Sequence, residues 1–343
     1  MSRSWVGCVS IVTFLTRMLR RRVEGAGKPT IAWDDPIAKG ELVTGLVNDA
    51  LAILAALEEL TLDGEEADAM GLLALVAGQD VEPGDTDGTW RIAQRVAPDR
   101  VISTVDPETR HMHKSRSEYR DGYKAHIAVE PETGLITAAA ITPANAADGP
   151  TGVALLDGEN PGVQVLADSA YGGGETRAAL RKARHHQAIK AIPIRPAVPG
   201  GFDRDDFVVD HDARTVTCPA GHAVNMTEKN NAVFQRHCNQ PCPLRERCTT
   251  AKDGRTVHIG AHDADLVEAR RAWRDGDFAT DYRRWRPMVE RSISWLVDNG
   301  HRRVRYRGVE RNQHGLLLRV AAINLRRLVN LGLSRDGPRW SIA

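Results

Sequence analysis

Apolar residues recur with helical spacing near both ends of the chain. Between residues 35 and 79 they stand three or four positions apart, which predicts two helices separated near Asp63. Helical spacing returns at about residue 277 and continues through residues 316–331, which predicts an amphipathic C-terminal helix. Residues 82–88 are predicted to form a loop from their Pro, Gly and Asp content.

Short apolar runs alternate with helical segments in the middle of the chain. Residues 123–129 and 135–142 predict two strands joined by a turn that contains Pro and Gly. A helix beginning near Asp148, a strand ending at Asp168, a helix over 175–184 and a strand over 188–194 follow. This order predicts an α/β fold, a mixed sheet flanked by helices.

Changes of pattern divide the 343-residue chain into four parts. Residues 196–276 are polar, lack long apolar runs and look like an insertion without a core of its own. Apart from this insertion, we expect an atypical N-terminal segment over 1–30, a helical segment over 31–100, and an α/β domain built from 101–195 and 277–333.

Arginines are concentrated in the last quarter of the chain, although the formal net charge is only +1. Such asymmetry is what a surface for polyanions requires, and a solvated helix face is the alternative. The apolar run over residues 5–15 is too short to span a bilayer, and its basic cluster follows it. We therefore expect a cytoplasmic protein that does not associate with membranes.

Four of the five cysteines lie in the insertion, which favours a metal site over a disulfide framework. Four thiolates can hold a structural zinc ion and so order a segment that lacks a core. Unliganded thiols are the alternative, and His222 and His237 are substitute ligands. The four predicted zinc ligands are Cys218, Cys238, Cys242 and Cys248.

Two acidic residues stand where they could bind divalent cations. Asp168 ends an apolar strand just before a Gly-rich turn, and Glu290 lies on an arginine-flanked helix. Carboxylates are suitable ligands for Mg²⁺, and pairs of such ions catalyse phosphodiester chemistry. We expect the two acids to converge on Mg²⁺, although an Asp at such a position is also a common helix cap.

Four motifs, taken in order, resemble those of bacterial insertion-sequence transposases of the DDE type. They are residues 121–129, 142–148, 166–172 and 286–291, within a similarity that extends over roughly residues 31–333. The resemblance implies an RNase H-like fold whose three acids bind two Mg²⁺ or Mn²⁺ ions for DNA nicking and strand transfer. By position, Asp168 is the second acid and Glu290 the third, while Arg286 matches the arginine that precedes the family's Glu.

The chain departs from the family at the first acid. Nothing ahead of Gly27 offers the Asp-Ser-Thr-like motif, so we expect an N-terminally truncated element that is inactive unless this acid is supplied. Asp106 is the one candidate, and an Asp-Pro turn is its alternative. Tyr282 sits one place off the family's signature and Val297 replaces its Lys, for which Arg302 or Arg303 are shifted substitutes.

The resemblance implies double-stranded DNA as partner, at the element ends and at the target, in the bacterial cytoplasm at the nucleoid. A homodimer is compatible with this function. A catalytically dead DNA-binding remnant or regulator is the alternative, and a hydrolytic RNase H-like nuclease is a third hypothesis. Lys124 is either a phosphate contact or part of an exposed strand edge. The expected DNA-binding residues are Lys124, Arg286, Arg291, Arg302, Arg303, Arg305 and Arg307.

Overall fold

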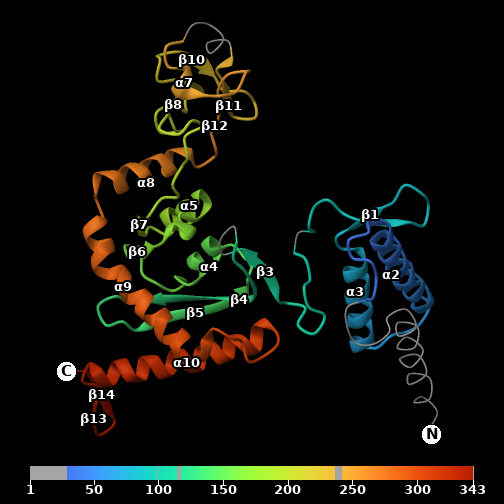
Figure 1. Cartoon of the computed structure of the whole chain (residues 1–343). Helices are drawn as coiled ribbons and strands as arrows, with labels where there is room; N and C mark the ends of the chain where they lie inside the picture. Colours follow the sequence, from blue (N-terminus) through green and yellow to red (C-terminus); the bar gives the residue numbers. More distant parts are fainter. Residues whose placement is uncertain (1–28, 98, 114–116, 236–241, 343) are drawn as a thin grey trace. The chain divides into compact units, whose positions relative to one another are not determined.

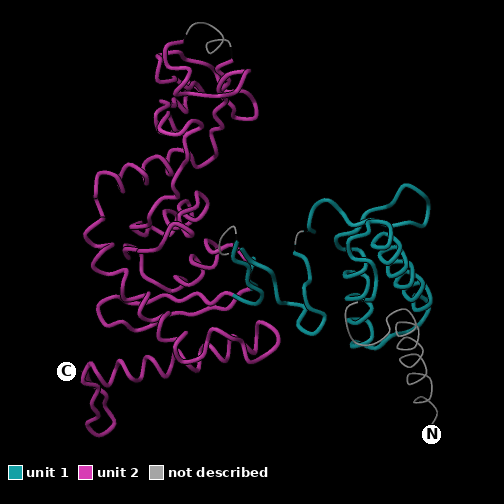
Figure 2. The backbone as a smooth tube through the Cα atoms, viewed as in Figure 1, with its two compact units in different colours: residues 1–123, 143–145 teal, residues 124–142, 146–343 magenta. Residues whose placement is uncertain are grey.

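The computed structural model describes residues 29–97, 99–113, 117–235 and 242–342, which belong to two compact units (Figure 2). Unit 1 comprises residues 1–123 and 143–145, and unit 2 comprises residues 124–142 and 146–343. Both units combine helices with small sheets, so the predicted α/β class is confirmed.

Unit 1 contains the predicted pair of helices, α2 (Pro36–Leu57) and α3 (Gly64–Gly78). Asp63 caps α3 in a capping box with Glu66, which explains why the chain restarts a helix there. Among the described helices, α2 is the one long and apolar enough to cross a membrane. A single such helix is weak evidence for a span, because core helices of soluble proteins have the same composition.

A short hairpin follows α3, with strands β1 (Val81–Pro83) and β2 (Trp90–Ile92). The predicted loop over 82–88 therefore begins too early, because its first two residues belong to a strand. Trp90 is held by Thr44 of α2, whose hydroxyl exchanges hydrogen bonds with the Trp90 amide and carbonyl. This tertiary contact is not visible in a composition pattern.

The predicted hairpin forms an antiparallel sheet in the order β3 (Arg110–His113), β4 (Tyr119–Val129) and β5 (Ile136–Pro143). The turn between β4 and β5 closes through the Glu130 amide, which donates to Leu135 O. Gly134 adopts a φ of +77° in this turn, a conformation that favours glycine.

The next elements of unit 2 are α4 (Asp148–Ala154), β6 (Gln164–Ala167), the 3-10 helix η1 (Ser169–Tyr171), α5 (Gly174–Lys182) and β7 (His186–Ile189). β6 and β7 pair in parallel, as expected for strands joined by a helix. β7 ends at Ile189 instead of residue 194, and among the described residues no backbone pairing joins β6 and β7 to β3–β5. The single mixed sheet that we predicted is thus present as two separate pieces.

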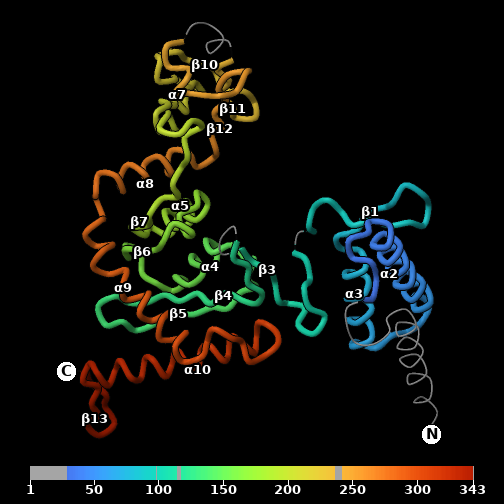
Figure 3. Tube along the Cα trace, viewed as in Figure 1, coloured from blue at the N-terminus to red at the C-terminus, as the bar shows by residue number. Residues whose placement is uncertain are grey.

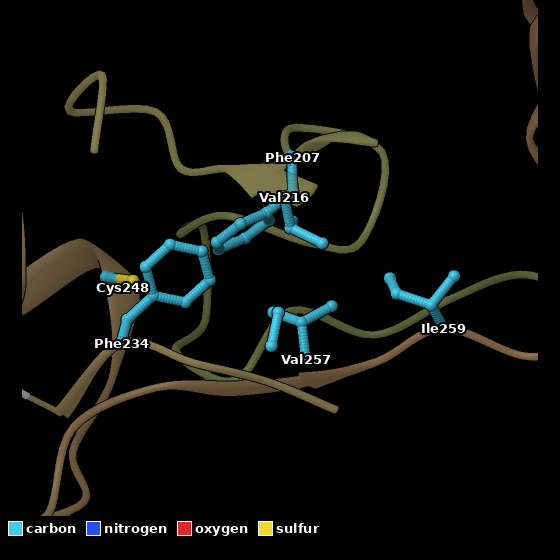
Figure 4. Close-up of a cluster of buried hydrophobic side chains, with 7 residues drawn as sticks. Phe207, Val216, Phe234, Cys248, Val257 and Ile259 are labelled. Atoms are coloured by element: carbon cyan, nitrogen blue, oxygen red, sulfur yellow. The ribbon is translucent and has the colours of Figure 1, made fainter. Parts of the chain in front are cut away.

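The Cys-bearing segment has a core of its own, contrary to our expectation. Phe207, Val216, Phe234, Val257 and Ile259 pack together, with the Cys248 sulfur beside the Phe234 ring (Figure 4). Apolar residues occur singly on very short strands here, so the sequence has no long apolar run from which this core could be predicted. The elements are β8 (Val208–Asp210), β9 (Thr215–Thr217), β10 (Ala223–Asn225), β11 (Asn231–Val233), α7 (Arg245–Cys248) and β12 (Thr256–His258).

Helix α8 (Asp263–Asp275) lies at the C-terminal end of the predicted insertion. Two ion pairs fasten the start of the insertion to α8, one between Arg204 and Asp263 and one between Arg270 and Asp205. Figure 3 follows the chain out of β7, through the insertion and back into this helix.

The C-terminal helices are α9 (Ala279–Leu296), its π-helical extension η2 (Val297–His301) and α10 (Val309–Asn330), followed by the hairpin β13 (Ser334–Asp336) and β14 (Arg339–Ser341). The predicted amphipathic C-terminal helix is confirmed. Leu316, Val320 and Ile323 of α10 form a core cluster with Ile136 of β5 and Leu296 of α9. Figure 1 shows α9 and α10 beside the strands of unit 2.

Candidate active site

Asp168 follows directly on β6, where its backbone is extended and its side chain caps η1. The Ala170 amide donates to Asp168 Oδ1 over 2.9 Å, so the helix-cap interpretation of this residue also holds. Oδ2 points instead toward Arg286 of α9. The carboxylate is 45% exposed, which leaves it accessible to solvent and ions.

The turn after Asp168 is held rigidly by two features. A Cβ added at Gly172 would lie 2.8 Å from Lys190 O, so the close approach of the two backbones requires glycine. The buried side chain of Arg177 donates from Nε to Gly172 O and from Nη2 to Ile189 O. Sequence reasoning missed this positioning role, because an arginine on a helix gives no signal that it is buried.

Arg286 links the two predicted acids. Its Nη2 lies 3.4 Å from Asp168 Oδ2 and 3.9 Å from Glu290 Oε1, one helical turn further along α9. The arginine side chain is 18% exposed, whereas that of Glu290 is 64% exposed. The structure therefore brings both acids to one guanidinium, at positions far apart in sequence.

A partly buried chain of hydrogen bonds includes Tyr171, three residues after Asp168. His126 Nδ1 shares a hydrogen bond with the Tyr171 hydroxyl (3.1 Å), and Nε2 shares one with Thr142 Oγ1 (3.0 Å). Burial, then the negative charges of Asp148 and Asp168, raise the pKa of Tyr171 to about 12, against a lowering effect of Arg286. Burial also lowers the pKa of His126.

Lys124 is engaged inside unit 2. Its ammonium donates to Asp148 Oδ1 over 2.9 Å and to Ala146 O over 2.8 Å. A phosphate contact by Lys124 would therefore have to compete with the Asp148 carboxylate. Asp148 is a further acid near Tyr171, which the sequence indicated as a helix start and as the end of the motif over residues 142–148.

Asp106 lies in unit 1, where it begins a turn closed by the Thr109 amide donating to Asp106 O. The Asp-Pro turn predicted as its alternative is thus present. The Tyr123 hydroxyl donates to Asp106 Oδ1 over 2.6 Å, so this carboxylate has a local structural role.

The predicted DNA-binding arginines other than Arg286 are exposed. Arg291 lies on α9, and the others lie on the segment between η2 and α10. Within the described part of the chain, none of the four in this segment has a carboxylate within ion-pair distance. They are Arg302, Arg303, Arg305 and Arg307.

Three of the four predicted zinc ligands line one small cavity of about 20 Å³, together with His222. They are the thiols of Cys218, Cys242 and Cys248, whereas Cys238 lies outside the described residues. No group of three or more His, Cys, Asp or Glu side chains among the described residues is arranged to hold a metal ion. This finding applies to the acids around Arg286 as well as to the cysteines.

Accessible carboxylates can bind divalent cations, and neighbouring arginines can attract a polyanion such as DNA. A family model, the transposase DDE domain, matches residues 89–325. The chain therefore belongs to the DDE transposases of the insertion-sequence type, which act on DNA and generally use divalent metal ions. No curated protein and no solved structure matches the chain.

Proposed function

We propose that this chain performs DNA strand cleavage and transfer by two-metal phosphodiester chemistry, with Asp168 and Glu290 as metal ligands in an RNase H-like arrangement. The convergence of both carboxylates on Arg286 is the observation that carries the proposal. Both acids are accessible to a hydrated Mg²⁺ ion, which prefers such oxygen ligands. Arg286 then neutralises the acids in the metal-free state and is available to a DNA phosphate once a cation replaces it.

A third acid completes the proposed site only if it comes from outside the described residues around Arg286. We therefore expect the chain alone to cleave DNA slowly, so that the test needs a high enzyme concentration. The missing third acid and the positive charge of Arg286 beside both carboxylates also favour the alternative function, a catalytically dead DNA-binding regulator. Asp106 stays the candidate within this chain for the missing acid.

The deciding experiment incubates the purified chain with Mg²⁺ and a genomic DNA fragment that carries its reading frame and both flanks. Transposase activity produces nicks with 3′-hydroxyl ends and strand-transfer products. Asp168→Asn and Glu290→Gln should each lower the rate by at least about a hundredfold, the usual size for losing one transition-state contact. Glu310→Gln, an exposed acid on α10, is the matched control and should cleave normally.

Two outcomes separate the hypotheses. Cleavage retained by either the Asp168 or the Glu290 variant would reject the assigned site. DNA binding with a steep salt dependence and no Mg²⁺-dependent cleavage, even at high enzyme concentration, would identify the regulator. Hydrolysis without strand transfer to a DNA end would identify the nuclease instead.

Two further parts of the proposal concern partners and metal. Strand transfer joins both ends of an element to the target DNA, so we propose a homodimer on DNA in the bacterial cytoplasm. We also propose that the cysteine cluster binds a structural zinc ion, with Cys218, Cys242 and Cys248 around one cavity as support. Four protein ligands would leave no open position on the metal, so this zinc would not take part in catalysis.

A further inference from the structure

We propose that unit 2 holds one phosphate group between the guanidinium groups of Arg305 and Arg319, which belong to two different elements. Arg305 lies on the segment between η2 and α10, and Arg319 lies on α10 itself. A phosphate group offers several oxygen acceptors, which match the planar fork of donors on an arginine. As a contact to the DNA backbone this inference rests on the proposed function, whereas the phosphate site itself can be tested without DNA.

The segment between η2 and α10 is fixed to the helix that follows it. The buried Asn312 side chain donates from Nδ2 to Tyr306 O and to Gly308 O, over 2.8 Å in both cases. The Tyr306 ring lies against Gly315, where an added Cβ would stand 3.2 Å from Tyr306 Cε2. The backbone that carries Arg305 is therefore positioned before a ligand binds, which lowers the entropic cost of binding.

Arg319 is oriented by the end of the preceding helical element. Its Nη1 donates to Asn299 O over 2.6 Å and would lie 4.0 Å from a Cβ added at Gly300. The backbone of Asn299 and Gly300 departs from helical geometry within η2. The donors on Nε and Nη2 of Arg319 have no acceptor in the described part of the chain, so they are available to a ligand.

The two arginines form a positive cluster without an acidic partner. Neither has a carboxylate within ion-pair distance among the residues that the structure describes. Burial, then the positive charge of Arg305, lowers the pKa of Arg319, against a raising effect of Tyr306. An anion bound between the two guanidinium groups would offset this repulsion and would accept hydrogen bonds from both.

His301 is a second basic group that lacks a counterpart in this cluster. Its Nε2 is buried and has no hydrogen-bond partner among the described residues. Burial, then the charges of Arg319 and Arg305, lowers the pKa of this histidine to about 4. Asp298, the acid on the same element, accepts instead from the Ser294 hydroxyl (3.1 Å). A phosphate between the arginines would therefore also favour the protonated form of His301.

Solvated arginines that hold no ligand are the competing explanation of this cluster. Water and salt screen like charges at a protein surface, so two guanidinium groups can lie near each other without an anion. In that case phosphate would have only a general salt effect. A built site instead binds one phosphate per chain and saturates.

The first test titrates the full chain with inorganic phosphate, without DNA or Mg²⁺, and measures the heat of binding. One saturable site per chain is expected. Arg305→Gln and Arg319→Gln should each weaken binding at least about tenfold, because each removes charge-assisted hydrogen bonds. Arg305 is exposed, so its variant tests the site even if Arg319→Gln destabilises α10.

Arg271→Gln is the matched control for this titration. It removes one exposed arginine from α8 and should bind phosphate with unchanged affinity. Absence of saturation with the wild-type chain would overturn the proposed site. An equal loss of affinity in the control would show that phosphate responds to total charge, and this result would also overturn the site.

Duplex DNA distinguishes a backbone phosphate from a free one. Each neutralised phosphate contributes about −0.9 to the slope of log K against log salt concentration. If Arg305 and Arg319 share one DNA phosphate, the double variant should make the slope shallower by about 0.9, whereas a change of about 1.8 would mean two separate phosphates and would overturn sharing. An unchanged slope, with inorganic phosphate still bound by the wild-type chain, would reject DNA as the source of the phosphate.

The histidine provides an independent readout by NMR. Saturating inorganic phosphate should raise the pKa of His301 above its value of about 4 and should leave the exposed His314 unchanged. The His301 signal is identified by its absence from the spectrum of His301→Gln. An unchanged pKa of His301 in the saturated protein would place the phosphate elsewhere and would overturn the proposal. Since neither calorimetry nor NMR involves DNA cleavage, failure here is distinguishable from failure of the transposase proposal.

Discussion

His126 is a buried histidine that contacts Tyr171, a residue of the 3-10 helix that follows Asp168. It is 3% exposed and its two ring nitrogens meet Tyr171 and Thr142. Burial lowers its pKa, the charge of Lys124 lowers it further, and Asp148 opposes them. The imidazole is therefore neutral in the folded protein near pH 7.

This neutrality makes a prediction about stability. The unfolded chain protonates His126 below its ordinary pKa of about 6.5, whereas the folded chain resists protonation. The free energy of unfolding should therefore fall as the pH drops below about 6.5. His126 contributes at most about 1.4 kcal/mol per pH unit to this fall, and it should contribute no change above pH 7. Urea unfolding of wild type and His126→Gln at several pH values measures the difference. Parallel curves between pH 7 and 5 would contradict the prediction.

At this scale the sequence indicated Asp168 and Glu290 as candidate metal ligands, a role that stays a prediction, but it did not indicate which side chains connect them. Asp168 stands out because it ends an apolar strand, and Glu290 stands out because it lies among arginines on an amphipathic helix. Three connections depend on which helix packs on which strand. They are the Arg286 guanidinium between the two acids, the Lys124–Asp148 pair and the contacts of Arg177. A linear pattern does not contain that information, so Lys124 was predicted as a DNA contact although its ammonium has an internal partner.

At the scale of elements, the periodicity of the sequence predicted the helices and the β4–β5 hairpin, but it did not predict the very short strands. Helices α2, α3, α9 and α10 each repeat their apolar spacing over several turns. The strands of the insertion have three residues each, too few for alternation to be recognised. Their core depends on single residues such as Phe234, which is 1% exposed.

The prediction at this scale concerns zinc binding by the Cys-rich segment. If zinc orders it, the purified chain should contain about one zinc ion, and Cys218→Ser should abolish that content and expose the insertion to proteolysis. Chelation of wild type should give the same proteolytic pattern. Cys8→Ser, a cysteine outside the cluster in sequence, serves as control and should retain the metal. The prediction would be contradicted if the wild-type protein contained no zinc and resisted protease equally before and after chelation. The apolar core would then be sufficient to keep the insertion folded.

At the scale of the whole molecule, a net charge of +1 conceals a strongly uneven distribution. Unpaired arginines on the segment before α10 are available to phosphates, whereas arginines such as Arg204 and Arg270 are committed to carboxylates. These unpaired arginines of unit 2 are the proposed electrostatic contacts for the DNA substrate that the family implies. Solvated surface charge that never meets DNA is the competing explanation, and salt dependence distinguishes the two.

Each phosphate neutralised by an arginine contributes about −0.9 to the slope of log K against log salt concentration. Arg303→Gln with Arg305→Gln should therefore make the slope for duplex DNA shallower by about 2 and weaken binding most at low salt. Arg335→Gln with Arg339→Gln removes the same charge from the exposed β13–β14 hairpin and should leave the slope unchanged. Anisotropy titrations from 50 to 200 mM salt (roughly the range over which such slopes are resolved) measure both. An equal change in the two double variants would mean that DNA responds to total charge, and the segment before α10 would lose its assignment as the DNA-binding surface.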